Sequence, residues 1–170
     1  MNWGTILKES LATGMLLGIV VTIMIVLSFM INKEMWLENY PPDVKARWGP
    51  ISGKAKRQHA VFAVLFFGVL TGTMVYDVIR LEGVLGRPPS FLAIFASIGI
   101  VFLLFNLFDA VIIDWLILMV LWPGLGMLPG TEGMPGYKDA RRWIMNLLMG
   151  FALAPIAGVL VAGVVFSVFR

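Results

Sequence analysis

Two carboxylates, Asp109 and Asp114, lie inside the longest apolar stretch of this sequence, residues 91–122. The other strongly polar side chains in that stretch are Ser97 and Asn106. An ionised carboxylate in a lipid environment costs several kcal/mol unless it has a partner, a proton or water. The sequence therefore predicts that the pair has either a structural partner or a function within the membrane.

The spacing of these residues predicts which of them share a helix face. Asn106 precedes Asp109 by three residues, so the two lie on one face of a regular helix. Asp114 is rotated by roughly 140° from Asp109, so a regular helix turns the two carboxylates toward different neighbours and only a break brings them together. No Lys or Arg lies within the apolar stretches, so Asp109 is expected to be protonated or hydrated. Asp114 lies at the predicted depth of His59.

Three roles are open for this polar site, which we predict to comprise Asn106, Asp109, Asp114 and His59. Protonated carboxyl groups can hold helices together by hydrogen bonds, each worth about 1–2 kcal/mol. Acidic groups at mid-depth are also the usual elements of a proton or cation pathway. Two carboxylates can further act as acid and base in a membrane-embedded hydrolase. A proton or cation pathway and a hydrolase each require a cavity that reaches Asp109. A subunit that only docks to a larger membrane complex does not require one.

The composition indicates one membrane-embedded domain covering residues 1–170. Hydrophobic residues make up 59% of the chain and charged residues 14%, and the mean hydropathy is +0.91. Soluble domains average about 45–50% apolar and about 25% charged residues. Cysteine is absent, which excludes disulfides and thiol catalysis, and the single histidine excludes a multi-histidine metal or haem site within one chain. We expect no cofactor, and whether the polar site holds a metal ion stays open.

Four stretches are long and apolar enough to cross a bilayer, at about residues 11–31, 59–79, 95–122 and 143–169. Continuous apolar stretches in lipid must be helices, because every backbone polar group needs an internal partner. The predicted fold class is therefore all-α, a polytopic four-helix transmembrane bundle. The third stretch is longer than a simple crossing requires, so it must tilt, protrude or break.

Basic residues predict the orientation of the chain. The loops at residues 32–58 and 123–142, with the residues next to them, carry nine of the 13 Lys and Arg residues. This bias places both loops in the cytoplasm and both termini outside, in a plasma membrane of prokaryotic type. We read the net charge of +3 as contact with anionic lipid headgroups rather than with nucleic acid. The predicted headgroup ligands are Lys54, Lys56, Arg57, Arg141 and Arg142.

Small residues predict where helices approach one another closely. Gly150, Ala154, Gly158 and Ala162 recur every four residues in the fourth stretch. Shorter pairs, Gly14 with Gly18 and Gly68 with Gly72, lie in the first two stretches. Such ridges serve packing inside the bundle or form the face of a homo-oligomer.

The two basic loops resemble each other. Both contain a Glu followed by Pro, Lys, Ala-Arg and Trp, at residues 38–48 and 132–143. This similarity suggests two helical hairpins repeated in parallel about an axis along the membrane normal, and chance similarity of loop composition is the alternative.

The sequence thus predicts a small, non-enzymatic integral membrane protein with an intramembrane Asn/Asp site. This protein would act as a proton or cation pathway, or as an accessory or assembly subunit of a membrane complex. The alternative is a hydrolase that uses Asp109 and Asp114.

Overall fold

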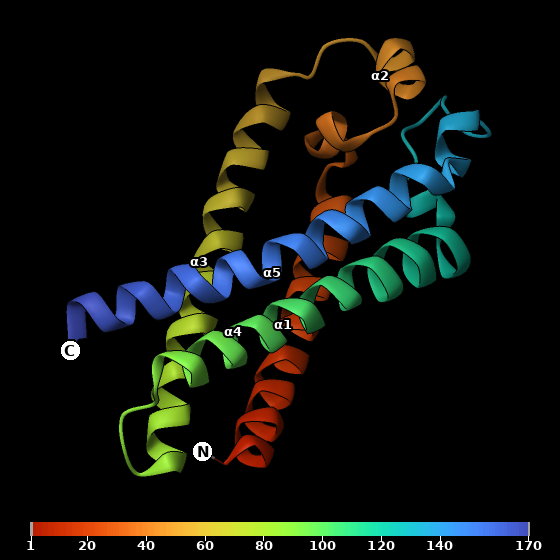
Figure 1. Ribbon diagram of the computed structural model, residues 1–170. Coiled ribbons are helices and arrows are strands. Elements are labelled where there is room, and N and C mark those ends of the chain that lie inside the picture. The colour runs from red at the N-terminus through yellow and green to blue at the C-terminus, as the bar shows by residue number, and fades with distance from the viewer. Residues whose placement is uncertain (1, 170) are drawn as a thin grey trace.

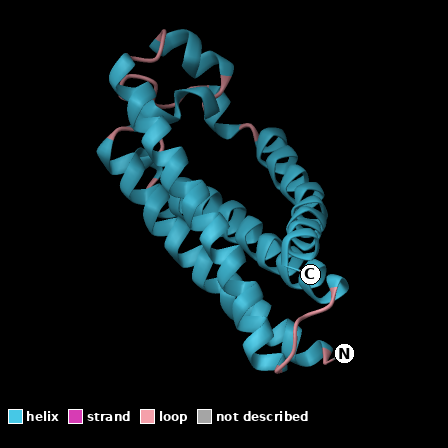
Figure 2. Cartoon of the chain, turned by 90° about the vertical axis from the view of Figure 1, so that its left-hand side faces the viewer, coloured by secondary structure: helices cyan, strands magenta, loops and turns pink. Residues whose placement is uncertain are grey.

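The computed structural model describes residues 2–169, with the backbone alone at residues 140, 142, 143, 168 and 169. Within that part the chain is all-helical, as the sequence predicts, and contains no strand (Figure 2). The α-helices are α1 (Trp3–Ile31), α2 (Pro42–Trp48), α3 (Gly53–Leu85), α4 (Phe91–Leu107) and α5 (Ala140–Phe169). Phe108–Leu121 continues α4 as a π-helix, and Lys33–Asn39, Pro123–Leu125 and Pro135–Lys138 form short 3₁₀ helices.

Four helical stretches of the described chain are long and apolar enough to span a membrane. They cover Trp3–Ile31, Gly53–Leu85, Phe91–Leu121 and Ile144–Ser167. Three of them start earlier than the apolar pattern predicts, because capping side chains extend the helices into polar sequence. Asn2, Ser52 and Ser90 each accept a hydrogen bond from a backbone N–H in the first turn that follows.

The ridge of small residues on α5 packs against α4, and these two helices run side by side (Figure 1). A Cβ at Gly150 would overlap the side-chain amide of Asn106, and a Cβ at Gly158 would lie 2.8 Å from the backbone carbonyl oxygen of Phe95. Ala154 and Ala162 are fully buried. The α5 ridge therefore serves packing within the chain, which is the first of the two roles that its spacing predicts.

The ridge on α1 also lies against α4 and its π-helical continuation. A Cβ at Gly14 would lie 2.7 Å from Leu104, and one at Gly18 would lie 2.5 Å from the ring of Phe108. By contrast, no atom lies within 4 Å of the corresponding position at Gly68 or Gly72 on α3. The α3 pair is thus the predicted ridge that stays open in the described chain.

The first and third loops lie at the same end of the helices and contact each other. The backbone N–H of Gly136 donates to Asp43 Oδ2 at 3.0 Å, and the rings of Tyr40 and Tyr137 meet edge to face. Lys33 Nζ donates to the carbonyl oxygen of Gly124 at 2.5 Å and to that of Met127 at 3.1 Å. These contacts join the two loops into one structure, which we call the loop cap (residues 32–52 and 122–139).

The similarity between the two loops does not extend to their structure. Residues 42–48, which contain Lys45, Arg47 and Trp48, form the separate helix α2. In the third loop, Pro135–Lys138 forms a 3₁₀ helix, and the following Ala-Arg segment begins the long helix α5. The loop pattern is therefore better explained by shared composition, because Pro, Lys and Trp are common where helices leave a membrane.

Candidate functional site: two carboxylates in a cavity under the loop cap

The π-helix changes which residues of the third spanning stretch share a face. Its hydrogen bonds join residues five apart, as Trp122 N–H shows by donating to the Ile117 carbonyl oxygen at 2.8 Å. Residues separated by four or five positions therefore align along the helix. Asp109 and Asp114 are five positions apart, so they lie on the same face. The prediction that they face different neighbours, which assumed a regular α-helix, is wrong for this reason.

A cavity of about 640 Å³ lies at the end of the spanning helices, beneath the loop cap. The π-helix lines it with residues spaced alternately by four, one, four and one positions: Asp109, Ile113, Asp114, Leu118 and Met119. That series confirms that the face carrying both carboxylates is the face turned to the cavity. The remaining wall comes from α1, from the loop cap and from Asn146 of α5.

Neither carboxylate has a hydrogen-bond or ion-pair partner among residues 2–169 for which side chains are described. Both are half-buried, and both line the same cavity. Lys138 also lines the cavity without an ion pair to either of them in the described structure. Two acidic groups that face the same space without a fixed partner are therefore available to a proton or a cation.

Asn106 belongs to the packing between helices rather than to the cavity wall. Its side chain is buried against Gly150, and it lies outside the set of residues that line the cavity. The α-helix ends at Leu107, so the three-residue spacing that was expected to align Asn106 with Asp109 crosses into the π-helix. In the structure, Asn106 therefore lies apart from the cavity that Asp109 and Asp114 line.

His59 is likewise separate from the cavity. Its ring meets Trp36 edge to face, with ring centroids 5.9 Å apart, and it is Trp36 that lines the cavity. His59 Nδ1 is buried without a hydrogen-bond partner in the described part of the chain. Trp36 in turn is held by a hydrogen bond from Nε1 to Ser28 Oγ, at 2.9 Å. His59 is thus placed to support a wall of the site instead of touching its contents.

The predicted headgroup ligands lie near the ends of the spanning helices. Lys54, Lys56 and Arg57 are exposed on the first turns of α3, and Arg141 is exposed on the first turn of α5. The side chain of Arg142 lies outside the described residues. Their contact with lipid stays a prediction.

The loop cap brings further titratable groups to the cavity, namely Tyr40, Tyr137, Lys138 and Asp139. Burial raises the pKa of Tyr40 above its ordinary value, and Tyr137 adds to this effect. Tyr40 therefore stays an uncharged phenol at neutral pH. Sequence reasoning missed these residues as site components, because only the contact between two distant loops places them above Asp109 and Asp114.

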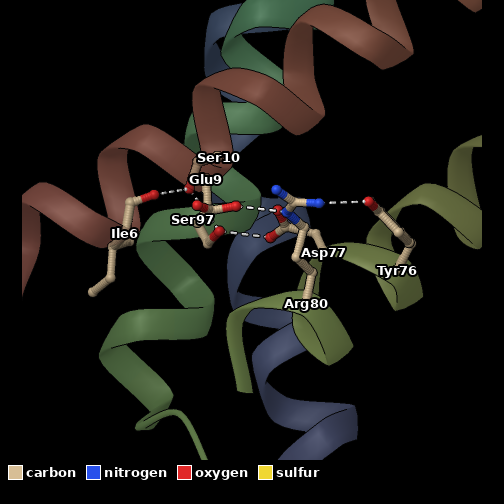
Figure 3. Close-up of polar contacts among 7 residues, drawn as sticks. All are labelled: Ile6, Glu9, Ser10, Tyr76, Asp77, Arg80 and Ser97. Carbon is tan, nitrogen blue, oxygen red and sulfur yellow. Dashed lines mark hydrogen bonds and ion pairs between the residues drawn. The ribbon is translucent and has the colours of Figure 1, made fainter. Parts of the chain in front are cut away.

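A second polar cluster lies at the opposite end of the helices, where α1, α3 and α4 meet (Figure 3). Ser97 Oγ donates to Asp77 Oδ2 at 2.5 Å, and Ser10 Oγ lies 2.7 Å from Ser97 Oγ. Arg80 pairs with Glu9 through Nε and Oε2, at 2.5 Å, and also donates to the hydroxyl of Tyr76. Each charged group here has a partner, so the cluster is a structural junction between helices.

The described residues contain no group of three or more His, Cys, Asp or Glu side chains able to hold a metal ion. No protein family, curated protein or solved structure matches this chain.

Proposed function

We propose that this chain forms a four-helix transmembrane bundle that takes up a proton or another cation at Asp109 and Asp114. One observation supports the proposal above the others: both carboxylates lie on the same face of a π-helix, line one cavity and have no partner among the described side chains. π-Helical segments are rare and frequently mark functional sites. A purely structural carboxyl group would instead be expected to hydrogen-bond to a neighbouring helix.

Proton or cation flux through reconstituted vesicles tests this function. Vesicles carrying the protein and an internal pH indicator are given a membrane potential with potassium and an ionophore. We expect the protein to accelerate proton entry over empty vesicles, and Asp109→Asn or Asp114→Asn to reduce that rate at least tenfold. Glu82→Gln is the matched control, because Glu82 is an exposed carboxylate on α3 that lies outside the cavity. A rate of proton entry equal to that of empty vesicles contradicts a proton pathway through this protein.

The cavity also supports a second candidate, a membrane-embedded hydrolase. Two carboxylates on one wall can act as acid and base, and the space beside them is large enough for part of a substrate. In that case an Asp→Asn change abolishes turnover of a cleaved peptide or lipid while proton flux is absent from the wild type. Flux without turnover excludes this candidate.

We further propose that the loop cap faces the cytoplasm of a prokaryotic cell and that its basic residues meet anionic headgroups. The support is the excess of Lys and Arg on that side. Because the chain has no cysteine, a single Lys54→Cys variant reports on this directly. Labelling by a membrane-impermeant maleimide in inverted vesicles but not in intact cells is expected, and the reverse pattern contradicts the orientation.

The open face of α3 supports self-association or docking to a membrane complex as a further part of this proposal. Gly68 and Gly72 meet no side chain of the described chain, although small residues of this spacing favour close helix contact. A cysteine at Gly72 should crosslink two copies in native membrane. Phe67, an exposed residue of α3 that lies about 100° round the helix from Gly68, is the control position. Crosslinking at Gly72→Cys that is no higher than at Phe67→Cys contradicts self-association through this face.

A further inference from the structure

The charges around the cavity favour a positively charged occupant. Asp109, Asp114 and Asp139 contribute acidic groups to its lining, whereas Lys138 is the one basic side chain among the residues that line it in the described structure. Asp109 and Asp114 lie deepest, on the spanning segment, while Lys138 and Asp139 belong to the loop cap. The charged groups of the deep wall are therefore acidic, and a cation placed there would meet two carboxylates that have no partner among the described side chains.

The rest of the wall is suited to a hydrophobic body rather than to a hydrated inorganic ion. Four aromatic rings line the cavity: Phe29, Trp36, Tyr40 and Tyr137. Thioether side chains of Met119, Met127 and Met134 line it as well. Aromatic faces attract organic cations, particularly where water is excluded, and methionine side chains adapt to irregular apolar shapes.

The volume of the cavity also favours an organic molecule over an inorganic ion. At about 640 Å³ it falls inside the range of about 300–1,000 Å³ that holds drug-sized molecules. A proton or a bare metal ion needs no such volume, and the described residues contain no group of three or more His, Cys, Asp or Glu side chains that could hold a metal ion. The combination of an acidic floor, aromatic walls and this volume is the chemistry of a site for an organic cation.

We propose that the cavity binds an amphipathic organic monocation, a protonated amine or quaternary ammonium compound with a hydrophobic body, with Asp109 and Asp114 as its counter-charge. This inference rests on the proposed function, because it names the cation that the carboxylate pair takes up. Aromatic rings of α1 and the loop cap hold the hydrophobic body. Protons and the organic cation compete for the same two carboxylates.

Binding of tetraphenylphosphonium, a hydrophobic monocation, tests the proposal on the full chain in lipid nanodiscs. Equilibrium dialysis against empty nanodiscs should show saturable binding. Asp109→Asn and Asp114→Asn should each weaken it at least tenfold, and Trp36→Leu should weaken it by a smaller factor. Glu82→Gln should leave it unchanged. Tetraphenylborate, which has the same shape and the opposite charge, should not compete.

The wild type alone supplies a second readout if an Asp variant does not fold. The described groups facing the site are Asp109 and Asp114 from the π-helix, and Tyr40, Tyr137, Lys138 and Asp139 from the loop cap. Neither α1 nor the described side chains of α5 contribute a titratable group to the lining. Affinity for the cation should fall as the pH is lowered from 8 to 5, because protons then occupy the carboxylates. Affinity that stays constant over this range overturns the proposal, as does equal binding of tetraphenylborate.

The two proposals fail in different ways. Proton flux that depends on Asp109 and Asp114, together with no saturable binding of tetraphenylphosphonium, overturns the organic-cation site and leaves the proton site standing. If neither flux nor binding depends on the carboxylates, both proposals are wrong.

Discussion

At the scale of single residues, the contact between Asn106 and Gly150 shows how one missing methyl group sets the distance between two helices. The amide of Asn106 occupies the space that a Cβ at residue 150 would need. The sequence predicted the ridge of small residues correctly, but it could not reveal that Asn106 fills the ridge. The sequence alone does not distinguish a polar residue that packs against a neighbouring helix from one that belongs to a functional site.

Gly150→Ala should destabilise the protein by about 1–3 kcal/mol, because the added methyl group overpacks the contact between α4 and α5. Gly163→Ala is the matched control on the same helix. No atom lies within 4 Å of its Cβ position, so the higher helix propensity of alanine makes that change neutral or stabilising. Apparent melting temperatures in detergent at one heating rate measure the difference.

A double variant separates the steric cause from other effects of Gly150→Ala. Asn106→Ala removes the amide that the new methyl group would meet, so it should restore much of the stability lost in Gly150→Ala. If the two changes instead add their losses, the packing contact between these residues is not the cause.

Glu34 provides a pH-dependent contact in the loop cap. Although desolvation raises its pKa, hydrogen bonds from the backbone and hydroxyl of Ser52 lower the pKa of Glu34, so that its net value lies below the ordinary 4.5. These bonds measure 2.7 Å and 2.8 Å. A lowered folded-state pKa means that the stabilisation is complete above about pH 5 and is lost as the pH falls through the folded value.

We therefore expect Glu34→Gln to be less stable than the wild type at pH 7 and nearly equal to it near pH 3. The effect should be small, because Glu34 lies near solvent. Melting temperatures of both proteins across this pH range check the prediction. A difference in melting temperature between the two proteins that grows as the pH is lowered would show that the pKa of Glu34 is not lowered in the folded state. Glu38→Gln, an exposed carboxylate in the same loop, is the control.

At the scale of elements, the spanning helices could be predicted from the sequence and the π-helix could not. Continuous apolar stretches identify helices because lipid leaves the backbone no other partner. The helices begin earlier in the structure than the apolar pattern predicts, because capping residues such as Ser52 and Ser90 extend a helix beyond its apolar part. The change from α to π at Phe108 has no proline or glycine to mark it, so the alignment of Asp109 with Asp114 emerged only from the structure.

Cysteine scanning measures the helix type directly, because the chain has no cysteine of its own. In the π-helix, cysteines at the positions of Ile113, Asp114 and Leu118 face the cavity and should react with a water-soluble thiol reagent. Cysteines at Val111 and Trp115, on the exposed apolar side of the described chain, should react slowly. Reactivity that recurs with a period of 3.6 residues would show a regular α-helix instead.

At the scale of the whole molecule, the loop cap and the helices together make the cavity. The sequence placed both basic loops on one side, and their contacts in the structure agree with that placement. It could not show that Tyr40 and Tyr137 cover two carboxylates, because these residues are far apart in the chain and belong to loops without a regular pattern. The paired cluster of Asp77 and Ser97 lies at the other end of the helices, whereas Asp109 and Asp114 lie under the cap without a partner among the described side chains.

Asp109 and Asp114 are expected to exchange protons or cations as a pair, and infrared titration of the carboxyl C=O band tests this expectation most directly. In lipid, the wild type should lose this band in two steps between pH 4 and 10, because the two groups interact. Asp109→Asn and Asp114→Asn should each leave one step, and Glu82→Gln should leave both. A band from these residues that persists unchanged over the whole range would show fixed, protonated carboxyl groups that only hold helices together, and would contradict proton or cation exchange at this pair.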